Sequence, residues 1–125
     1  MNYFKKSKMG NFKKLNVWME SVVLAKEVFQ QLNTDQLQHE YVLKDQIKRS
    51  VISIASNIAE GEEMSSNKHA IHYFTIAKAS TAELQTQLLL AFHFKFLEQN
   101  TYEIFDNQCD KIRAMLNNLI KSRLA

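Results

Sequence analysis

The scarcity of turn-forming residues constrains the fold of this chain more than any other feature. Its 125 residues include two glycines and no proline. Tight turns, hairpin loops and phosphate-cradling loops depend on these residues, so an all-β fold and a glycine-rich nucleotide site are disfavoured. The absence of helix breakers instead predicts an all-α chain. With 46% apolar residues at this length, we expect one compact domain.

The single cysteine and the short apolar runs indicate in which cellular compartment the protein is located. The single cysteine cannot form an internal disulfide, which excludes a secreted disulfide scaffold and fits a reducing cytosol. The longest wholly apolar run, Leu88 to Phe92, is too short to cross a bilayer. The basic N-terminus lacks the apolar segment of a secretory signal. We therefore expect a cytoplasmic protein with no membrane partner.

Positive charge is concentrated at the start of the chain. Residues 1–14 carry five lysines and no acidic residue, while the rest of the chain carries 11 basic and 13 acidic side chains. Lysines neutralise phosphates and aromatic rings stack on bases, so this segment is a candidate RNA-binding tail. The alternative is a disordered, solubilising terminus. The candidate RNA-binding residues are Lys5, Lys6, Lys8, Lys13 and Lys14.

Two stretches in the first half of the chain have the apolar spacing of amphipathic helices. In the first, the apolar stripe consists of Leu15, Trp18, Val22, Ala25, Phe29 and Leu32, and a turn follows at residues 33–35. The second spans about residues 40–60, with Gly61 as its expected terminator. Its apolar line consists of Ile47, Val51, Ile54 and Ile58.

Two further helices are predicted in the second half. The third begins at an N-cap, Ser65 or Ser66, and continues to about Leu97, and its last ten residues are apolar nearly all round. The fourth follows a break and cap at Asn100-Thr101, with a stripe of Phe105, Cys109, Ile112, Leu116 and Leu119. Short links between the four helices predict an antiparallel up-down four-helix bundle. We assign residues 12–125 to this bundle and residues 1–11 to a flexible basic N-terminal arm.

A polar line runs beside the apolar line of the second helix. Its members share the same spacing one position earlier: Gln46, Ser50, Ser53, Asn57 and Glu60. Together with Arg49, they favour a seam that sets helix register and subunit geometry in an oligomer. Arg49 and Glu60 are too far apart on one helix to pair, so each needs a partner from another helix or subunit. The alternative is a ligand-binding or catalytic role.

The residue order of the second helix resembles that of a known family. The segment Leu43-Lys-Asp-Gln-Ile-Lys-Arg-Ser50, followed by Ser53-Ile-Ala-Ser-Asn-Ile-Ala-Glu-Gly61, is similar to four-helix-bundle proteins encoded in intervening sequences of bacterial 23S ribosomal RNA genes. The resemblance covers roughly residues 12–97 and includes Phe12, Lys13, Trp18, Phe74, Ala77, Ser80, Glu83, Leu84 and Ala91. The chain departs from the family in lacking prolines around the second helix. It also has Phe94 to Leu97 in place of a usual Gly-Tyr pairing, which affects a local contact rather than the fold.

The resemblance carries expectations about function. It implies a homo-oligomeric bundle, a ring of five, with no established enzymatic activity and a suspected role in RNA metabolism. A similar bundle is the accessory protein of diversity-generating retroelements, where it works with nucleic acid and a reverse transcriptase. We therefore expect a non-enzymatic scaffold without cofactors, whose oligomerisation combines the charge of several lysine arms to hold RNA.

Two other function classes stay open. The first is a protein-interaction module with its partner on the apolar end of the third helix, which predicts a monomer with an exposed patch of Phe92, Phe94 and Phe96. The second is a small metal-dependent nucleotide hydrolase, in which several carboxylates must converge on one magnesium ion. Its candidate ligands are Glu60, Glu63, Glu103 and Asp106, although the first two lie on either side of Gly61.

Three further residues are interpreted structurally. His69 and His72 share a helix face and could offer two metal ligands, but an exposed polar turn is favoured because the Glu-x-x-His pairs of diiron bundles do not occur in the sequence. Cys109 lies on an apolar stripe and is expected to be a small core residue rather than a nucleophile. We therefore predict no catalytic residue and no metal site.

Overall fold

The computed structural model describes residues 11–34 and 36–124, most of which form four α-helices. The helices are α1 (Asn16–Gln31), α2 (Tyr41–Glu63), α3 (Asn67–His93) and α4 (Gln99–Ser122). Two short 3-10 helices, η1 (Phe12–Lys14) and η2 (Gln36–His39), precede α1 and α2. The described ranges contain no strand, which confirms the predicted all-α class with four helices.

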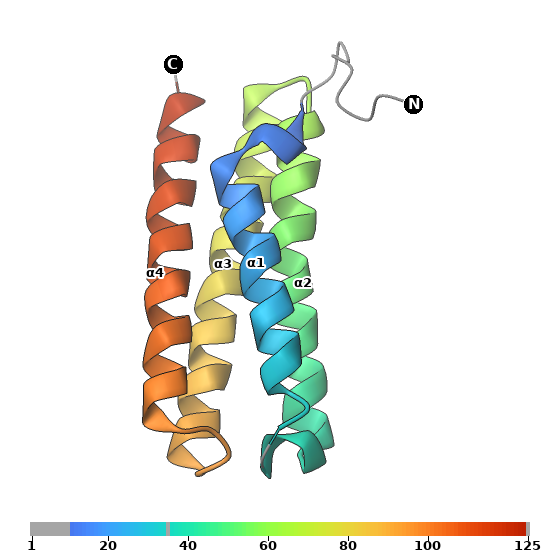
Figure 1. Ribbon diagram of the computed structural model, residues 1–125. Helices are drawn as coiled ribbons and strands as arrows, with labels where there is room; N and C mark the ends of the chain where they lie inside the picture. The colour runs from blue at the N-terminus through green and yellow to red at the C-terminus, as the bar shows by residue number, and fades with distance from the viewer. Residues whose placement is uncertain (1–10, 35, 125) are drawn as a thin grey trace.

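The helices lie side by side, and the colour gradient of Figure 1 shows that each runs opposite to the one before it. The most extensive interface joins α2 to α3, the next joins α3 to α4, and α1 packs more lightly on α2 and α4. We call the end that carries η1, the α2–α3 connection and the end of α4 the η1 end. The opposite end, with η2, the start of α2 and the α3–α4 connection, is the η2 end (Figure 1).

The buried face of α1 differs from the predicted stripe. The residues turned fully inward are Val17, Ser21, Leu24 and Val28. Of the predicted stripe, Leu32 is buried, Val22 is exposed, and the others are half-buried: Leu15, Trp18, Ala25 and Phe29. The buried line, in which Ser21 is the one polar member, has the same three-and-four spacing as the predicted stripe beside it. The spacing cannot distinguish them, and the packing of α2 and α4 against this helix selects the line that contains Leu24.

The apolar line of α2 is confirmed, but the predicted end of the helix is wrong. The buried residues include Ile47, Val51, Ile54 and Ile58. The helix does not stop at Gly61 and continues to Glu63. Gly61 is buried inside the last turns, where a Cβ atom would lie 2.5 Å from Cε1 of Phe74 on α3. This glycine therefore allows two helices to approach closely and does not serve as a terminator.

The start of α3 is as predicted, whereas its end comes earlier. Ser66 is the N-cap, and its hydroxyl accepts a hydrogen bond from the backbone N–H of His69 at 3.1 Å. The helix stops at His93 rather than Leu97 because Lys95 adopts a left-handed conformation with φ 66°. The backbone N–H of Lys95 donates to the Phe92 carbonyl and that of Phe96 to the Ala91 carbonyl. This pair of bonds is the Schellman motif that closes many helices.

The apolar stripe of α4 is confirmed, with Phe105, Cys109, Ile112 and Leu116 buried and Leu119 half-buried. Its predicted cap at Asn100-Thr101 is wrong, because Glu98 occupies the N-cap position and both residues lie inside the first turn. Stripes from all four helices and from η2 meet in one core. No helix in the described ranges is long and apolar enough to span a membrane.

Candidate interaction surfaces

The middle of the polar seam on α2 faces α3. The hydroxyl of Ser50, which is buried, donates to Oε1 of Glu83 at 2.7 Å. The hydroxyls of Ser53 and Ser80 lie 2.8 Å apart, within hydrogen-bonding distance. The side-chain amide of Asn57 donates to the carbonyl of Ser53 at 2.8 Å and to its hydroxyl at 3.0 Å. The Ser50–Glu83 and Ser53–Ser80 contacts fix the register of α2 against α3 within one chain, whereas the Asn57 bonds lie within α2 and hold Ser53 in place.

The other members of the seam point outward. Gln46, Arg49 and Glu60 are exposed. Within residues 11–34 and 36–124, neither the Arg49 side chain nor the Glu60 side chain has a hydrogen bond or ion pair. The seam therefore divides into an inner part that joins two helices and an outer part that faces solvent. Its predicted role in subunit geometry depends on the outer part.

The structure describes two of the five candidate RNA-binding lysines. Lys5, Lys6 and Lys8 lie outside the described residues. Lys13 and Lys14 are exposed on η1, at the η1 end of the bundle. Phe12, the first residue of η1, packs edge-on against Trp18 with ring centroids 5.2 Å apart. This contact ties the two lysines to the first turn of α1.

The candidate metal ligands do not converge. Glu60 and Glu63 lie near the end of α2, at the η1 end, whereas Glu103 and Asp106 lie near the start of α4, at the η2 end (Figure 1). His69 and His72 are exposed, and Nδ1 of His69 lies 2.9 Å from the hydroxyl of the N-cap Ser66. In the part of the chain that the structure describes, no three His, Cys, Asp or Glu side chains are grouped to hold a metal ion.

Cys109 lies in the core between helices. It is fully buried, and this burial, followed by the nearby charges of Asp106 and Asp110, raises the pKa of its thiol to about 12. A thiol with so high a pKa is almost entirely protonated near neutral pH and is a poor nucleophile. The position and chemistry of Cys109 agree with the predicted structural role.

A polar cluster between α3 and α4 was not predicted from the sequence. The Gln85 amide nitrogen donates to Oδ1 of Asp106 at 3.0 Å and of Asp110 at 2.8 Å, and its oxygen accepts from Nη1 of Arg113 at 3.2 Å. Burial and the Asp106 charge raise the pKa of the neighbouring Tyr102. Asp106, Asp110 and Arg113 are three or four positions apart, so the sequence alone indicates that they share a face of α4. Gln85 belongs to a different helix, so no sequence pattern predicts the whole cluster.

A second unpredicted group, which we call the C-terminal clasp, consists of Glu62, Phe74 and Arg123. Nη2 of Arg123 donates to Oε1 of Glu62, and the guanidinium lies 5.7 Å from the centre of the Phe74 ring. The side chains of Arg123 and Glu62 are 24% and 15% exposed. The clasp joins the ends of α2 and α4 across α3. Since the charged partners are 61 residues apart, local sequence contains no signal for it.

An apolar groove lies at the η2 end, between the start of α2 and the end of α3. We call this space of about 650 Å³ the α2–α3 groove. Its lining includes Tyr41, Val42, Leu90, Phe94, Phe96 and Gln87. Tyr41 and Val42 are 71% and 79% exposed, which is unusual for large apolar side chains. Gln87 is only 8% exposed, and its Oε1 has no hydrogen-bond partner among the described residues.

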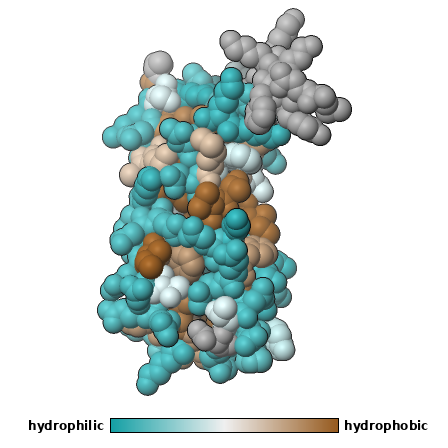
Figure 2. Space-filling view, viewed as in Figure 1, coloured by the Kyte–Doolittle hydropathy of each residue, from teal (hydrophilic) through white to brown (hydrophobic). Residues whose placement is uncertain are grey.

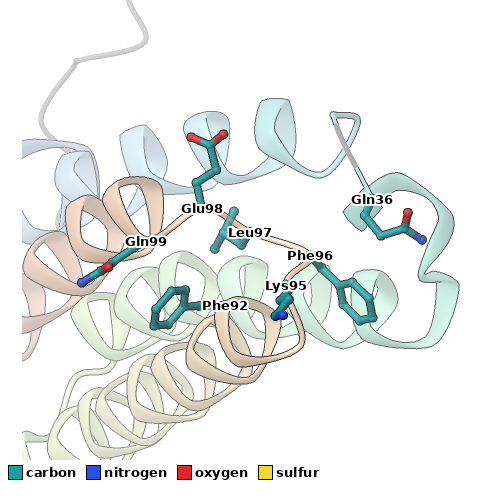
Figure 3. A pocket seen from close by; sticks show the side chains of 7 residues that line it. All are labelled: Gln36, Phe92, Lys95, Phe96, Leu97, Glu98 and Gln99. Carbon is teal, nitrogen blue, oxygen red and sulfur yellow. The ribbon is translucent and has the colours of Figure 1, made fainter.

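The three phenylalanines of the predicted interaction patch lie in different surroundings. Phe94 is 56% exposed and packs edge-on against the half-buried Phe96 at 5.9 Å. Phe92 stacks on Tyr102 of α4 at 5.4 Å. Figure 3 shows a second hollow, about 470 Å³, where Phe92 and Phe96 lie on either side of Lys95 and Phe96 points toward η2. Phe96 borders both hollows, whereas Phe92 borders only the second.

These features define an all-α protein of four helices, whose exposed apolar and basic surfaces are separate from its core. Residues 13–118 match the model of the family described as 23S rRNA-intervening sequence protein. The chain belongs to this family. The match confirms the resemblance found in the sequence and extends it through most of α4.

A solved structure supports the same assignment. The crystal structure of a protein with unknown function from the S23 ribosomal protein family, from Bacteroides thetaiotaomicron, is 29% identical in sequence and gives a TM-score of 0.76. The similarity covers 84% of this chain and 98% of that chain. No curated protein matches this chain.

Proposed function

We propose that the protein is a non-enzymatic, homo-oligomeric scaffold of the cytoplasm, an antiparallel up-down bundle that holds RNA through its lysine-rich N-terminal segment. The observation that carries this proposal is the position of Lys13 and Lys14. Both are exposed on η1, where the basic segment of residues 1–14 joins the bundle. Because Phe12 packs on Trp18, these charges are held at one end of a rigid body.

Oligomerisation makes a modest charge effective. The whole chain has a formal net charge of +3, which is too mild for strong binding of one copy to RNA. When several copies associate, their basic segments can bind the same RNA. After the first segment has bound, binding of the next one is intramolecular, which raises the overall affinity. A ring of five, as the family resemblance implies, multiplies each weak contact in this way. The family description names a 23S rRNA intervening sequence, and this association with an RNA gene is the reason for choosing RNA as the ligand to test.

The geometry is less favourable to the hydrolase alternative. The four candidate carboxylates are distributed over both ends of the bundle, so they cannot bind one ion together. Cys109 is buried and its thiol pKa is raised to about 12, so it does not supply a nucleophile. In the interaction-module alternative, the apolar surface at the η2 end binds a different protein. This alternative predicts a monomer and the scaffold predicts an oligomer, so the oligomeric state distinguishes the two.

Fluorescence anisotropy with a labelled single-stranded RNA across a salt series tests the proposal. The intact protein is compared with a chain lacking residues 1–11, with the double variant Lys13→Gln/Lys14→Gln, and with the control Lys44→Gln/Lys95→Gln at the η2 end. We expect affinity to fall steeply with salt, and the salt slope to decrease by about 0.7 for each phosphate contact that is removed. The control should bind as the intact protein does. Absence of binding at low salt, or an equal loss in the control, would contradict the proposal.

A further inference from the structure

We propose that the α2–α3 groove is a binding site for a free, uncharged nucleobase or nucleoside, one that carries an amino group beside a ring nitrogen as adenine does. The inference goes beyond the proposed RNA scaffold, because the groove lies at the η2 end and the basic η1 lies at the other end of the bundle. It is supported by the aromatic lining of the groove, by an unpaired amide within that lining, and by the sign of the charge at its edge.

The size and lining of the groove are those of a small-molecule site. The space measures about 650 Å³, and ligand sites usually measure about 300–1,000 Å³. The walls are mainly apolar, with Val42 and Leu43 from α2 and Leu90 from α3. Ligand sites typically combine such walls with a few polar groups that orient the bound molecule.

Aromatic rings border the groove on both sides. Tyr41 on α2 is 71% exposed and Phe94, directly after α3, is 56% exposed, so both rings are accessible to a ligand. Phe96 packs against Phe94 with an angle of 60° between the ring planes. The left-handed Lys95 turns the chain between these two phenylalanines and brings Phe96 back onto the groove. Planar bases are stabilised by stacking on aromatic side chains, so this lining favours a flat heterocycle.

Gln87 gives the groove a hydrogen-bonding requirement. It belongs to the lining and is only 8% exposed, and its Oε1 is buried without a hydrogen-bond partner among the described residues. Within the same ranges, its Nε2 makes no hydrogen bond either. Buried polar groups in native proteins are nearly always paired. A ligand that pairs with this amide therefore satisfies a group that the chain alone leaves unsatisfied.

The amide of Gln87 specifies the edge of the ligand. A carboxamide offers one acceptor and one donor side by side, and the torsion that carries it is soft enough to turn both toward the groove. Glutamine pairs with adenine through two bonds, in which Oε1 accepts from the amino group N6 and Nε2 donates to the ring nitrogen N7. A base with an amino group beside a ring nitrogen therefore matches Gln87, whereas a base without the amino group leaves Oε1 unpaired.

The charge at the edge of the groove favours an uncharged ligand. Glu40 lines the groove, and the described residues of the lining include no lysine or arginine. A phosphate close to Glu40 would be repelled, and the lining offers no cationic side chain to offset the repulsion. The groove therefore suits a free base or nucleoside better than a nucleotide or a base within an RNA chain.

The other exposed apolar surface does not specify a ligand in this way. Met19, Val22 and Val23 on α1 are 44%, 40% and 46% exposed. Figure 2 shows apolar side chains gathered midway along the molecule on the side from which α1 is seen, amid hydrophilic neighbours. These three side chains contain no strong hydrogen-bond donor or acceptor, so they cannot select a ligand by its polar edge.

Isothermal titration calorimetry with adenosine tests the site. Purine riboside, which lacks the amino group, is the matched ligand, and Gln87→Met, which replaces the amide with an apolar chain of similar length, is the matched variant. Phe94→Ala removes one aromatic ring at an exposed position. The control is Ile104→Ala, a 49% exposed position on α4 outside the groove. Circular dichroism verifies that each variant keeps the helical content of the wild type.

We expect the wild type and the control to bind one adenosine per chain. Purine riboside should bind the wild type about fivefold more weakly than adenosine does, and Gln87→Met should weaken adenosine binding at least as much, because each change removes hydrogen bonds to the amide. Phe94→Ala should weaken adenosine binding by about fivefold or more, since a stacking surface is lost. Deletion of residues 1–11 should leave adenosine binding unchanged, which separates this site from the proposed RNA-binding segment.

Failure of the inference is distinguishable from failure of the proposed function. A wild type that does not bind adenosine overturns the inference and leaves the RNA scaffold intact. Equal affinity for adenosine and purine riboside overturns the role of Gln87, and this comparison needs no variant to fold. If oligoadenylate binds the chain lacking residues 1–11 more tightly than adenosine does, and Gln87→Met abolishes that binding, the groove holds a base of RNA and the assignment to a free nucleoside is overturned.

Discussion

At the scale of single residues, Gly61 determines how closely α2 and α3 approach. A Cβ atom at this position would lie 2.5 Å from Cε1 and 2.7 Å from Cδ1 of Phe74, and 3.1 Å from the carbonyl oxygen of Ala70. Real Cβ atoms do not approach ring carbons so closely, so Phe74 must move if Gly61 is replaced. Phe74 is fully buried and belongs to the C-terminal clasp, so its movement affects more than one helix.

Gly61→Ala is therefore expected to destabilise the protein, although alanine is the better helix former. Overpacking costs about 1–3 kcal/mol, and the gain in helix propensity returns up to about 1 kcal/mol, so we expect a net loss of about 1–2 kcal/mol. Urea denaturation measures the change. Ser56→Ala, an exposed position in the same helix, serves as the control and should leave stability nearly unchanged. A stabilised Gly61→Ala protein would show that Phe74 does not restrict this site.

Cys109 introduces a pH dependence at high pH. Burial raises the pKa of its thiol from 9.0 to about 12, so the folded state favours the protonated form. For an acid with a raised pKa, the stabilising contribution is complete below the unfolded pKa and is lost as the pH rises through the folded value. We expect the stability difference between the wild type and Cys109→Ala to be constant up to about pH 8 and to shrink above pH 9. A difference that does not vary with pH would contradict this.

At the scale of helices, the end of α3 is set by one strained residue. Lys95 has φ 66°, a conformation that costs an ordinary residue about 1–2 kcal/mol and glycine almost nothing. The same residue forms the turn that closes α3 and brings Phe96 back onto the α2–α3 groove.

Lys95→Gly is expected to stabilise the protein by about 0.5–1 kcal/mol, because relief of the strain exceeds the extra freedom of glycine in the unfolded chain. Lys95→Ala is the matched control. It removes the same charge and keeps a Cβ atom, so it should give no such gain. Thermal and urea denaturation of the two variants provide the measurement, and equal stability of Lys95→Gly and Lys95→Ala would disprove the role of the left-handed conformation.

At the scale of the whole molecule, the C-terminal clasp connects the end of α2 to the end of α4 through partners that are 61 residues apart in the sequence. The largely buried ion pair of Glu62 and Arg123 closes the η1 end over Phe74, next to the site of Gly61. This end also carries the basic η1. The η2 end, in contrast, holds the groove and the strained turn.

Arg123→Ala should lower the free energy of unfolding by about 1–2 kcal/mol, because it leaves the carboxylate of Glu62 unpaired at a half-buried site. Arg123→Lys should recover only part of this loss, since an ammonium group cannot cover the Phe74 ring as the planar guanidinium does. Lys121→Ala, an exposed neighbour, is the control. Full recovery with lysine would show that charge alone sustains the clasp.

The sequence by itself determined the number and nature of the helices, because these depend on local features. The absence of proline, the spacing of apolar residues in α2 and α4, and the Ser66 cap act over a few residues and can be interpreted without a fold. The order of residues from Leu43 to Gly61 also indicated the family, which the match over residues 13–118 confirms.

Only the tertiary structure decided which surfaces face each other. It selected the line of α1 that contains Leu24 over the one that contains Trp18, because both have helical spacing and only packing distinguishes them. It placed Gly61 inside α2, since the close neighbour, Phe74, belongs to the next helix. The groove and the clasp combine residues more than 40 positions apart, and such contacts depend on how helices pack against one another. Local spacing contains no information about that packing.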